Sequence, residues 1–211
     1  MQILLFDLDN TLYAATTGIA LALDTRMTDF VSRTLAIDPL AARELRRRYL
    51  AQYGTSMRGL ATEHGVDIED FLHEIHDLEF DTLLARDPLL DDLLGQLRAR
   101  KAIFTNAPRE HAEAVLRVLG VAHHFAAIYD IRFAEFLPKP NRPFYHAVLA
   151  ALDSQPHAAT FVEDSIQNLV AARELGMATV LIGAAPHPAA DVVFPDIYAT
   201  LRHLIAQEAA S

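Results

Sequence analysis

The feature that most constrains the fold is an alternation of short apolar runs with helical segments, which begins near Lys101 and continues almost to the end of the chain. The runs have strand length and are expected as strands at 102–105, 127–129, 160–162, 178–182 and 192–194. The segments between them predict helices at 109–119, 143–152, 166–175 and 197–206. Repeated βα units of this size favour a parallel, doubly wound sheet, so we expect an α/β fold.

A long insertion is expected near the N-terminus. A first strand at 2–5 is separated from the next clear strand by residues 12 to 104, far more than an ordinary crossover needs. Apolar residues recur there at helical spacing, with breaks expected at 38–39, 54–59, 65–67 and 87–88. We therefore predict a core domain of residues 1–14 and 86–211, interrupted by a helical domain of residues 15–85.

Composition excludes several classes of protein. The 211 residues are 52% hydrophobic and only 22% charged, which fits a folded domain with an inserted module rather than a disordered chain. Acidic residues outnumber basic ones 28 to 18, a net charge of -10 that argues against nucleic-acid polymers or anionic membranes as partners. There is no cysteine, so disulfides, zinc–thiolate sites and thiol nucleophiles are excluded.

The N-terminus leads straight into a strand, without the basic region or cleavage site of a signal peptide. No apolar run approaches the roughly 18 residues that span a bilayer. We expect a soluble, cytoplasmic protein.

Two carboxylates follow the first strand. Asp7 and Asp9 are spaced i, i+2 and are followed by Thr11. If strand geometry continues into this segment, both acids lie beyond the carboxyl end of the strand, where open α/β sheets bind their ligands.

A phosphoryl-transferring aspartate would need a second carboxylate for proton transfer, a divalent cation, donors for the phosphate oxygens and a positive charge. Thr105 and Asn106 end the second strand at a helix start, which is an anion-binding arrangement. Lys139 lies on a loop between two prolines, where it could neutralise phosphate and nucleophile together.

A third acidic stretch follows the strand at 160–162. Asp164 is the natural metal carboxylate of this stretch, and Ser165 is a plausible N-cap. That cap would place Asp164 and Asn168 four residues apart, so that they converge on one point. Glu163 and Asn168 would then act on the metal indirectly, through the first ligands or through water.

These stretches, Asp7/Asp9, Thr105–Asn106, Lys139 and Glu163–Asp164, resemble motifs I to IV of the haloacid dehalogenase (HAD) superfamily, whose members are mostly phosphatases. The resemblance implies a Rossmann-like core with an inserted helical C1 cap. It implies that Asp7 is the nucleophile, Asp9 the general acid and base, Thr105 a phosphate ligand and Lys139 the electrostatic clamp. Mg²⁺ would be held by the Asp7 carboxylate, the Asp9 backbone carbonyl and Asp164.

Within this superfamily, the sequence resembles the pyrimidine 5′-nucleotidase-like HAD proteins most closely. This resemblance rests on the stretches 7–13, 53–60, 104–107 and 161–165. In those relatives a Tyr-Gly-Thr loop followed by an arginine lies in the cap, so Arg58 is a candidate substrate contact; the alternative is that residues 54–59 simply join two helices. Glu163 departs from the aspartate found in many relatives.

The leading hypothesis is a Mg²⁺-dependent phosphatase of pyrimidine nucleoside 5′-monophosphates. The alternatives are a broad phosphatase of sugar phosphates, phosphoglycolate or pyridoxal phosphate, a phosphomutase, a 2-haloacid dehalogenase and a non-catalytic phosphate-sensing module. Asp9 speaks against a dehalogenase, which needs no general acid two residues after its nucleophile.

One further pair of residues stands outside this scheme. His123 and His124 follow a predicted helix, and we interpret them as a loop pair that complements the helix dipole.

Overall fold

The computed structural model describes residues 2–210, which form two compact units. One unit runs to Thr16 and resumes at Leu84; the other spans Thr17–Leu83. From the sequence, we expected the helical domain to begin at residue 15 and to end at residue 85. Among residues 2–210, no helix is both long and apolar enough to cross a lipid bilayer.

The first unit is built on a six-stranded sheet in which every strand runs parallel to its neighbours. The strands are β1 (Ile3–Phe6), β2 (Arg100–Phe104), β3 (Ala127–Tyr129), β4 (Ala159–Glu163), β5 (Ala178–Ile182) and β6 (Val192–Phe194). Their order is β3-β2-β1-β4-β5-β6, so the chain begins in the middle of the sheet and is wound outward in both directions. The predicted parallel, doubly wound α/β fold is confirmed.

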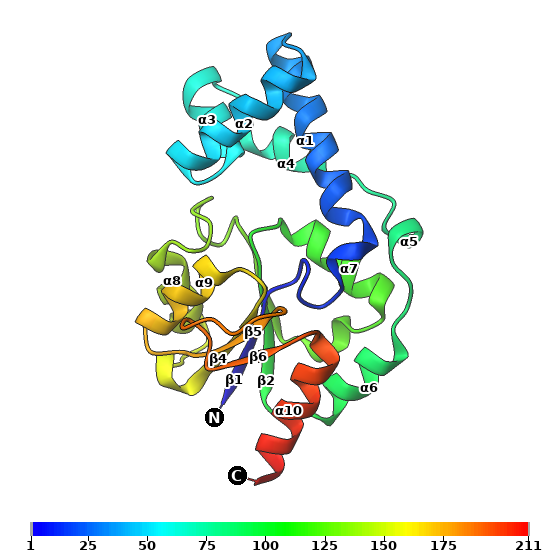
Figure 1. The fold of residues 1–211 in the computed structure, drawn as a ribbon, viewed down its shortest axis with the longest axis vertical. Helices are drawn as coiled ribbons and strands as arrows, with labels where there is room; N and C mark the ends of the chain where they lie inside the picture. The colour runs from blue at the N-terminus through cyan, green and yellow to red at the C-terminus, as the bar shows by residue number, and fades with distance from the viewer. Residues whose placement is uncertain (1, 211) are drawn as a thin grey trace. The chain divides into compact units, whose positions relative to one another are not determined.

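Helices cover both faces of this sheet (Figure 1). On one face lie α8 (Arg142–Ala151) and α9 (Ile166–Glu174). On the other lie α6 (Pro88–Gln96), α7 (Arg109–Leu119) and α10 (Ile197–Ala210). Short 3-10 turns, η2 (Ala122–His124) and η3 (Pro156–Ala158), precede β3 and β4.

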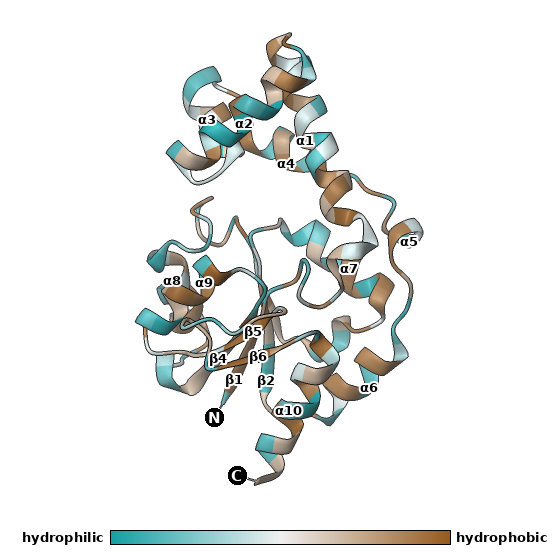
Figure 2. Cartoon of the chain, viewed as in Figure 1, coloured by the Kyte–Doolittle hydropathy of each residue, from teal (hydrophilic) through white to brown (hydrophobic). Residues whose placement is uncertain are grey.

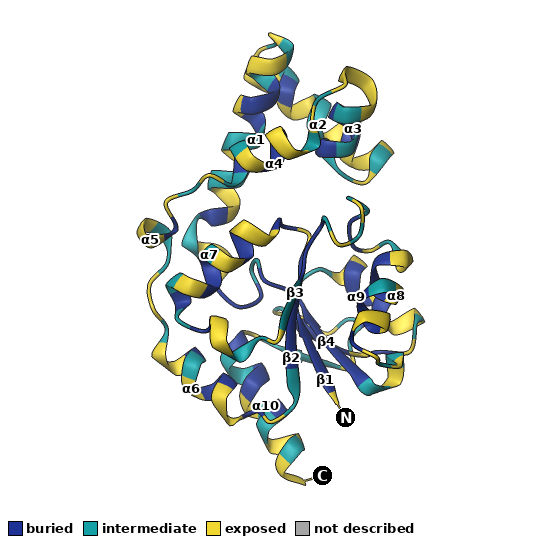
Figure 3. Ribbon diagram, turned by 180° about the vertical axis from the view of Figure 1, so that it is seen from behind, coloured by how far each residue is buried: buried dark blue, intermediate teal, exposed yellow. Residues whose placement is uncertain are grey.

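Alternate residues of β1 point to opposite faces, and all four are buried. Ile3 and Leu5 belong to the core formed with α8 and α9. Phe6 points to the other face, where its ring meets Phe125 edge-on at 5.9 Å between centroids. The central strands are accordingly apolar (Figure 2) and buried (Figure 3), as expected for a parallel sheet covered on both sides. Their apolar bodies leave polar groups only at the strand ends.

The second unit is helical. It contains α1 (Ile19–Leu35), α2 (Pro39–Tyr53), α3 (Ser56–His64), α4 (Ile68–His76) and the short α5 (Phe80–Leu83). The 3-10 turn η1 (Ala15–Thr17) crosses the boundary between the first unit and this one. Asp38 and Asp67 cap α2 and α4 by accepting hydrogen bonds from backbone N–H groups of the first turns. The sequence analysis did not anticipate α5.

One predicted break in this unit was wrong. The segment 54–59 is not a loop, because only Gly54 and Thr55 separate α2 from α3, which begins at Ser56. Gly59 lies inside α3, and a Cβ atom there would fall 2.2 Å from Cγ of Tyr49. Gly59 therefore serves close helix packing rather than helix breaking.

Candidate active site

Asp7 and Glu163 lie side by side at the carboxyl end of the sheet. The Asp7 N–H donates to the Val162 carbonyl at 2.9 Å, which continues the pairing of β1 with β4 by one residue. Leu5 is paired with Phe161, so two residues further along the same face Asp7 stands beside Glu163. Both carboxyl groups are buried. Parallel pairing therefore brings two acids together out of water.

Lys139 joins these two acids. Its ammonium donates to Asp7 Oδ1 at 2.7 Å, to Glu163 Oε2 at 2.8 Å and to the Phe104 carbonyl at 2.7 Å. It also lies about 5 Å from the ring centroids of Phe104 and Phe161, at 5.0 and 5.1 Å, within cation–π range. The three donor hydrogens of the ammonium each have an oxygen acceptor, so the buried charge is fully compensated.

Asn106 fixes the backbone of Lys139. Its Oδ1 accepts from the Lys139 N–H at 2.7 Å, and its Nδ2 donates to the Lys139 carbonyl at 3.2 Å. The sequence analysis expected Asn106 to bind substrate, and the structure uses its side chain to position the lysine.

The ionisation of the cluster follows from this geometry. Burial, together with the neighbouring Glu163 carboxylate, raises the pKa of Asp7 to about 7, although Lys139 opposes the rise. Burial likewise raises the pKa of Glu163. Burial alone would lower the pKa of Lys139, but the two carboxylates outweigh it and raise that pKa above its usual value. Lys139 therefore stays charged, while the acids take up protons readily.

Glu163 is held by further donors. The Ser165 N–H donates to its Oε1 at 3.1 Å, and Asn168 Nδ2 donates to its Oε2 at 3.0 Å. Ser165 occupies the N-cap position of α9, but its hydroxyl makes no capping bond. Asn168 thus bonds to Glu163, whereas from the sequence we expected its side chain to converge with that of Asp164 on one point.

Asp9 lies in the turn that follows β1. Asn10, at φ 61°, takes the left-handed conformation that closes this turn. The Thr11 hydroxyl donates to Asp7 Oδ2 at 3.3 Å. Asp9 Oδ1 accepts a hydrogen bond from the Tyr13 hydroxyl and lies 2.6 Å from His111 Nε2.

His111 is the site residue that the sequence analysis missed. It is buried on α7, in line with Val115 and Leu119 at spacings of four residues. A histidine on the apolar face of a helix is the signal that could have pointed to it, but nothing in the sequence names Asp9, 102 residues earlier, as its partner.

The carboxylates form a candidate Mg²⁺ site. Ligand oxygens of Asp7, Glu163 and Asp164 all lie within 4.8 Å of one another. Oxygen donors of this kind suit Mg²⁺. Burial raises the pKa of Asp164, and the nearby Asp7 charge adds to the rise, so a cation would relieve the repulsion. Because Glu163 already accepts from Lys139, Ser165 and Asn168, Asp7 and Asp164 are the better placed ligands.

Thr105 directly follows β2, beside this cluster. Its N–H donates to the Tyr129 carbonyl at 3.0 Å, and its hydroxyl oxygen accepts from the Ala107 N–H at 3.0 Å. The hydroxyl hydrogen is thus left to donate to a ligand. Arg58 lies in α3 of the helical unit, and its role in binding substrate stays a prediction.

Comparisons with known proteins identify the family. A family model described as haloacid dehalogenase-like hydrolase matches residues 1–176. The chain therefore belongs to the haloacid dehalogenase-like hydrolases. It is also 30% identical over 195 residues to Phosphate metabolism protein 8 of Saccharomyces cerevisiae, covering 85% of this chain and 61% of that protein.

Solved structures have the same fold. An HAD phosphatase from Thermococcus onnurineus is 25% identical with a TM-score of 0.63, covering 97% of this chain and 98% of that one. The HAD-hydrolase YfnB from Bacillus subtilis bound to magnesium is 16% identical with a TM-score of 0.64, covering 96% and 98%. An L-2-haloacid dehalogenase from Xanthobacter autotrophicus is 15% identical with a TM-score of 0.60, covering 96% and 97%. The last two share the fold only.

Replacing Lys139 tests the electrostatics of the cluster. In Lys139→Met, measured by denaturant unfolding in EDTA, we expect a loss of about 3 kcal/mol at pH 8, because two buried acids lose their cation. The loss should shrink towards pH 5: both acids have pKa values raised by burial, so the folded variant binds protons there and the repulsion disappears.

The matched control is Lys101→Met. Lys101 is buried too, but its ammonium donates to the Leu97 and Ala99 carbonyls rather than to carboxylates. Its removal should cost about 1 kcal/mol at both pH values. A loss in Lys139→Met that does not decrease on acidification would contradict the proposed electrostatics.

Proposed function

We propose that the chain is a Mg²⁺-dependent phosphomonoesterase that acts through an aspartyl-phosphate on Asp7. The observation that carries this proposal is the 2.7 Å contact between Asp7 and the buried Lys139 ammonium. A second acid, Asp9, follows Asp7 by two residues and is held by His111. A carboxylate can attack an anionic phosphate only where positive charge offsets the repulsion. The Thermococcus onnurineus relative is an HAD phosphatase and the yeast relative is named for phosphate metabolism, and both support the same chemistry.

In the first step an Asp7 carboxylate oxygen attacks phosphorus and the bond from phosphorus to the leaving oxygen breaks. Asp9 gives its proton to that oxygen, so the product leaves as a neutral alcohol. The Thr105 hydroxyl would bind an oxygen of the transferring phosphoryl group, and the Lys139 ammonium, held beside Asp7, would offset the negative charge that develops there.

In the second step Asp9, now a carboxylate, takes a proton from water, and the resulting hydroxide attacks phosphorus. The bond between phosphorus and Asp7 breaks, which releases inorganic phosphate and restores both acids. Because Asp9 Oδ1 accepts from Tyr13 and faces His111, the mobile proton belongs on Oδ2.

Mg²⁺ would be held by the carboxylates of Asp7 and Asp164 and by the Asp9 backbone carbonyl. When bound, it supplies positive charge that draws the anionic substrate to the anionic nucleophile. Glu163 and Asn168 would orient Lys139 and the neighbouring ligands rather than bind the ion themselves.

The proposed substrates are small phosphomonoesters, pyrimidine nucleoside 5′-monophosphates first among them. The support is the resemblance of the stretches 7–13, 53–60, 104–107 and 161–165 to the pyrimidine 5′-nucleotidase-like proteins. In this scheme residues 17–83 act as the cap that selects the leaving group, with Arg58 as a substrate contact, and closure excludes water during attack. A broad phosphatase of sugar phosphates and related metabolites is the alternative.

The test is phosphate release from a panel of phosphomonoesters, with Mg²⁺ and with EDTA. We expect turnover only with Mg²⁺, CMP and UMP ranking above sugar phosphates, and a loss of at least about 1,000-fold in kcat for Asp7→Asn. CMP and UMP ranking below sugar phosphates would reject the nucleotidase assignment. Near wild-type turnover by folded Asp7→Asn would reject the mechanism.

His111 is expected to position Asp9. In His111→Leu the Asp9 contact is lost, and kcat should fall about tenfold or more with KM nearly unchanged. The upper limb of the pH profile of kcat should move to higher pH, since a carboxylate that loses a donor holds its proton more tightly. His111→Gln, which keeps a donor at the same distance along the side chain, should recover most of kcat. Equal kcat values and pH profiles for the Leu variant and the wild type would contradict this role.

A further inference from the structure

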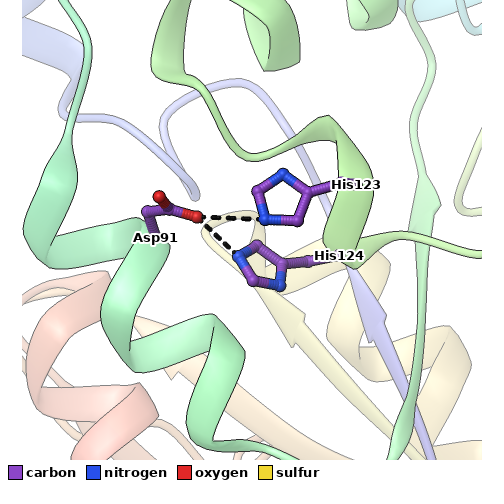
Figure 4. Close-up of side chains that lie close together, drawn as sticks. All are labelled: Asp91, His123 and His124. Atoms are coloured by element: carbon purple, nitrogen blue, oxygen red, sulfur yellow. Dashed lines mark hydrogen bonds and ion pairs between the residues drawn. The ribbon is translucent and has the colours of Figure 1, made fainter.

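A second cluster of potential ligands lies in the sheet-containing unit, on elements that contribute nothing to the carboxylate site. Asp91 is in the first turn of α6, and His123 and His124 form the end of η2. The His124 Nε2 atom lies 2.8 Å from Asp91 Oδ1, and the His123 Nε2 atom lies 3.2 Å from the same oxygen. Figure 4 shows both rings directing these nitrogens at one carboxylate oxygen.

The two imidazole rings belong to consecutive residues and converge on the same oxygen. The ring centroids are 4.0 Å apart with the ring planes at 40°, so both imidazoles lie on the same side of the turn. Each ring turns one nitrogen, an atom that can bind a metal, towards the same carboxylate oxygen. Three potential metal-ligating atoms therefore meet at one point.

The surroundings hold the cluster in place. The His124 side chain is 12% exposed and packs over Gly95 of α6, where a Cβ atom would lie 3.4 Å from its Cε1. Arg86 lies 3.8 Å from the other oxygen of Asp91.

The spacing fits a tetrahedral metal ion. Zn²⁺ bonds of about 2 Å to nitrogen and oxygen place neighbouring ligand atoms about 3.3 Å apart. The observed separations of 2.8 and 3.2 Å need only small shifts to reach that value, and the three ligand atoms all lie within 4.8 Å of one another. Imidazole nitrogens favour Zn²⁺ over Mg²⁺, which prefers oxygen ligands throughout.

We propose that Asp91, His123 and His124 form a Zn²⁺ site, distinct from the carboxylate site, with its remaining coordination position open to solvent. His123, which is 64% exposed, places that position at the protein surface. The ion would tie α6 to η2, close to the hydrogen bond from the Asp87 N–H, at the N-cap of α6, to the carbonyl of Leu119, the last residue of α7. A ligand of the folded state alone raises the thermal stability of the protein by mass action.

The test is calorimetric titration of Zn²⁺ into the EDTA-stripped and desalted full chain, in buffer with millimolar Mg²⁺ to occupy oxygen-only sites. The wild type should bind one equivalent more than the triple variant Asp91→Asn/His123→Gln/His124→Gln. The single variants Asp91→Asn and His124→Gln should each weaken this event at least about tenfold. His146→Gln, an exposed histidine of α8, should bind as the wild type does.

A thermal melt of each variant in EDTA shows whether it is folded. If the triple variant is not folded, the single variant His123→Gln, at the exposed ligand, replaces it in the titration. Zn²⁺ should raise the melting temperature of the wild type and of His146→Gln but not that of the ligand variants. Equal Zn²⁺ stoichiometry and affinity in the wild type and in a folded variant that lacks these ligands would overturn the proposal.

Discussion

The structure depends on one buried ion cluster, the Lys139 ammonium between the carboxylates of Asp7 and Glu163. Burying a carboxylate is costly unless it is paired and hydrogen-bonded, and here the parallel register of β1 and β4 places two of them side by side. A single cation contacts both, and Asn106 holds that cation's backbone in place. Lys139 offsets the cost of burying the two carboxylates. It also gives Asp7 the positive neighbour that a nucleophile towards phosphate requires.

The proton-transferring half of the proposed site is assembled differently. Asp9 lies in a turn rather than at a paired strand position, and its orientation comes from Tyr13 within the turn and from His111 on α7. Burial, and next the nearby charge of Asp9, raise the pKa of the Tyr13 hydroxyl, so Tyr13 keeps its proton and donates. Two acids only two residues apart thus have separate environments: Asp7 lies beside the Lys139 ammonium, and Asp9 lies beside the side chains of Tyr13 and His111. Such a difference is what two separate roles need.

Local rules predicted much of this protein from its sequence. Strand periodicity and helix-ending glycines located β3, β5, β6 and α7 at their observed bounds, and acids that end apolar runs marked Asp7 and Asp164. What local rules could not predict depends on residues far apart in the chain. From local sequence Gly59 is expected to break a helix, whereas in the structure it allows Tyr49 to pack against α3. The contacts of His111 with Asp9 and of His124 with Asp91 likewise join residues that are far apart in the sequence.

The central claim is that Asp7 carries a covalent phosphoryl group during turnover. The direct measurement is rapid acid quenching of enzyme with substrate, followed by borohydride reduction, which converts an aspartyl-phosphate to homoserine, and peptide mass spectrometry. We predict homoserine at position 7, dependent on substrate and on Mg²⁺, and unmodified Asp9 and Asp164. Turnover without any modification of Asp7, or with modification at another acid, would contradict it.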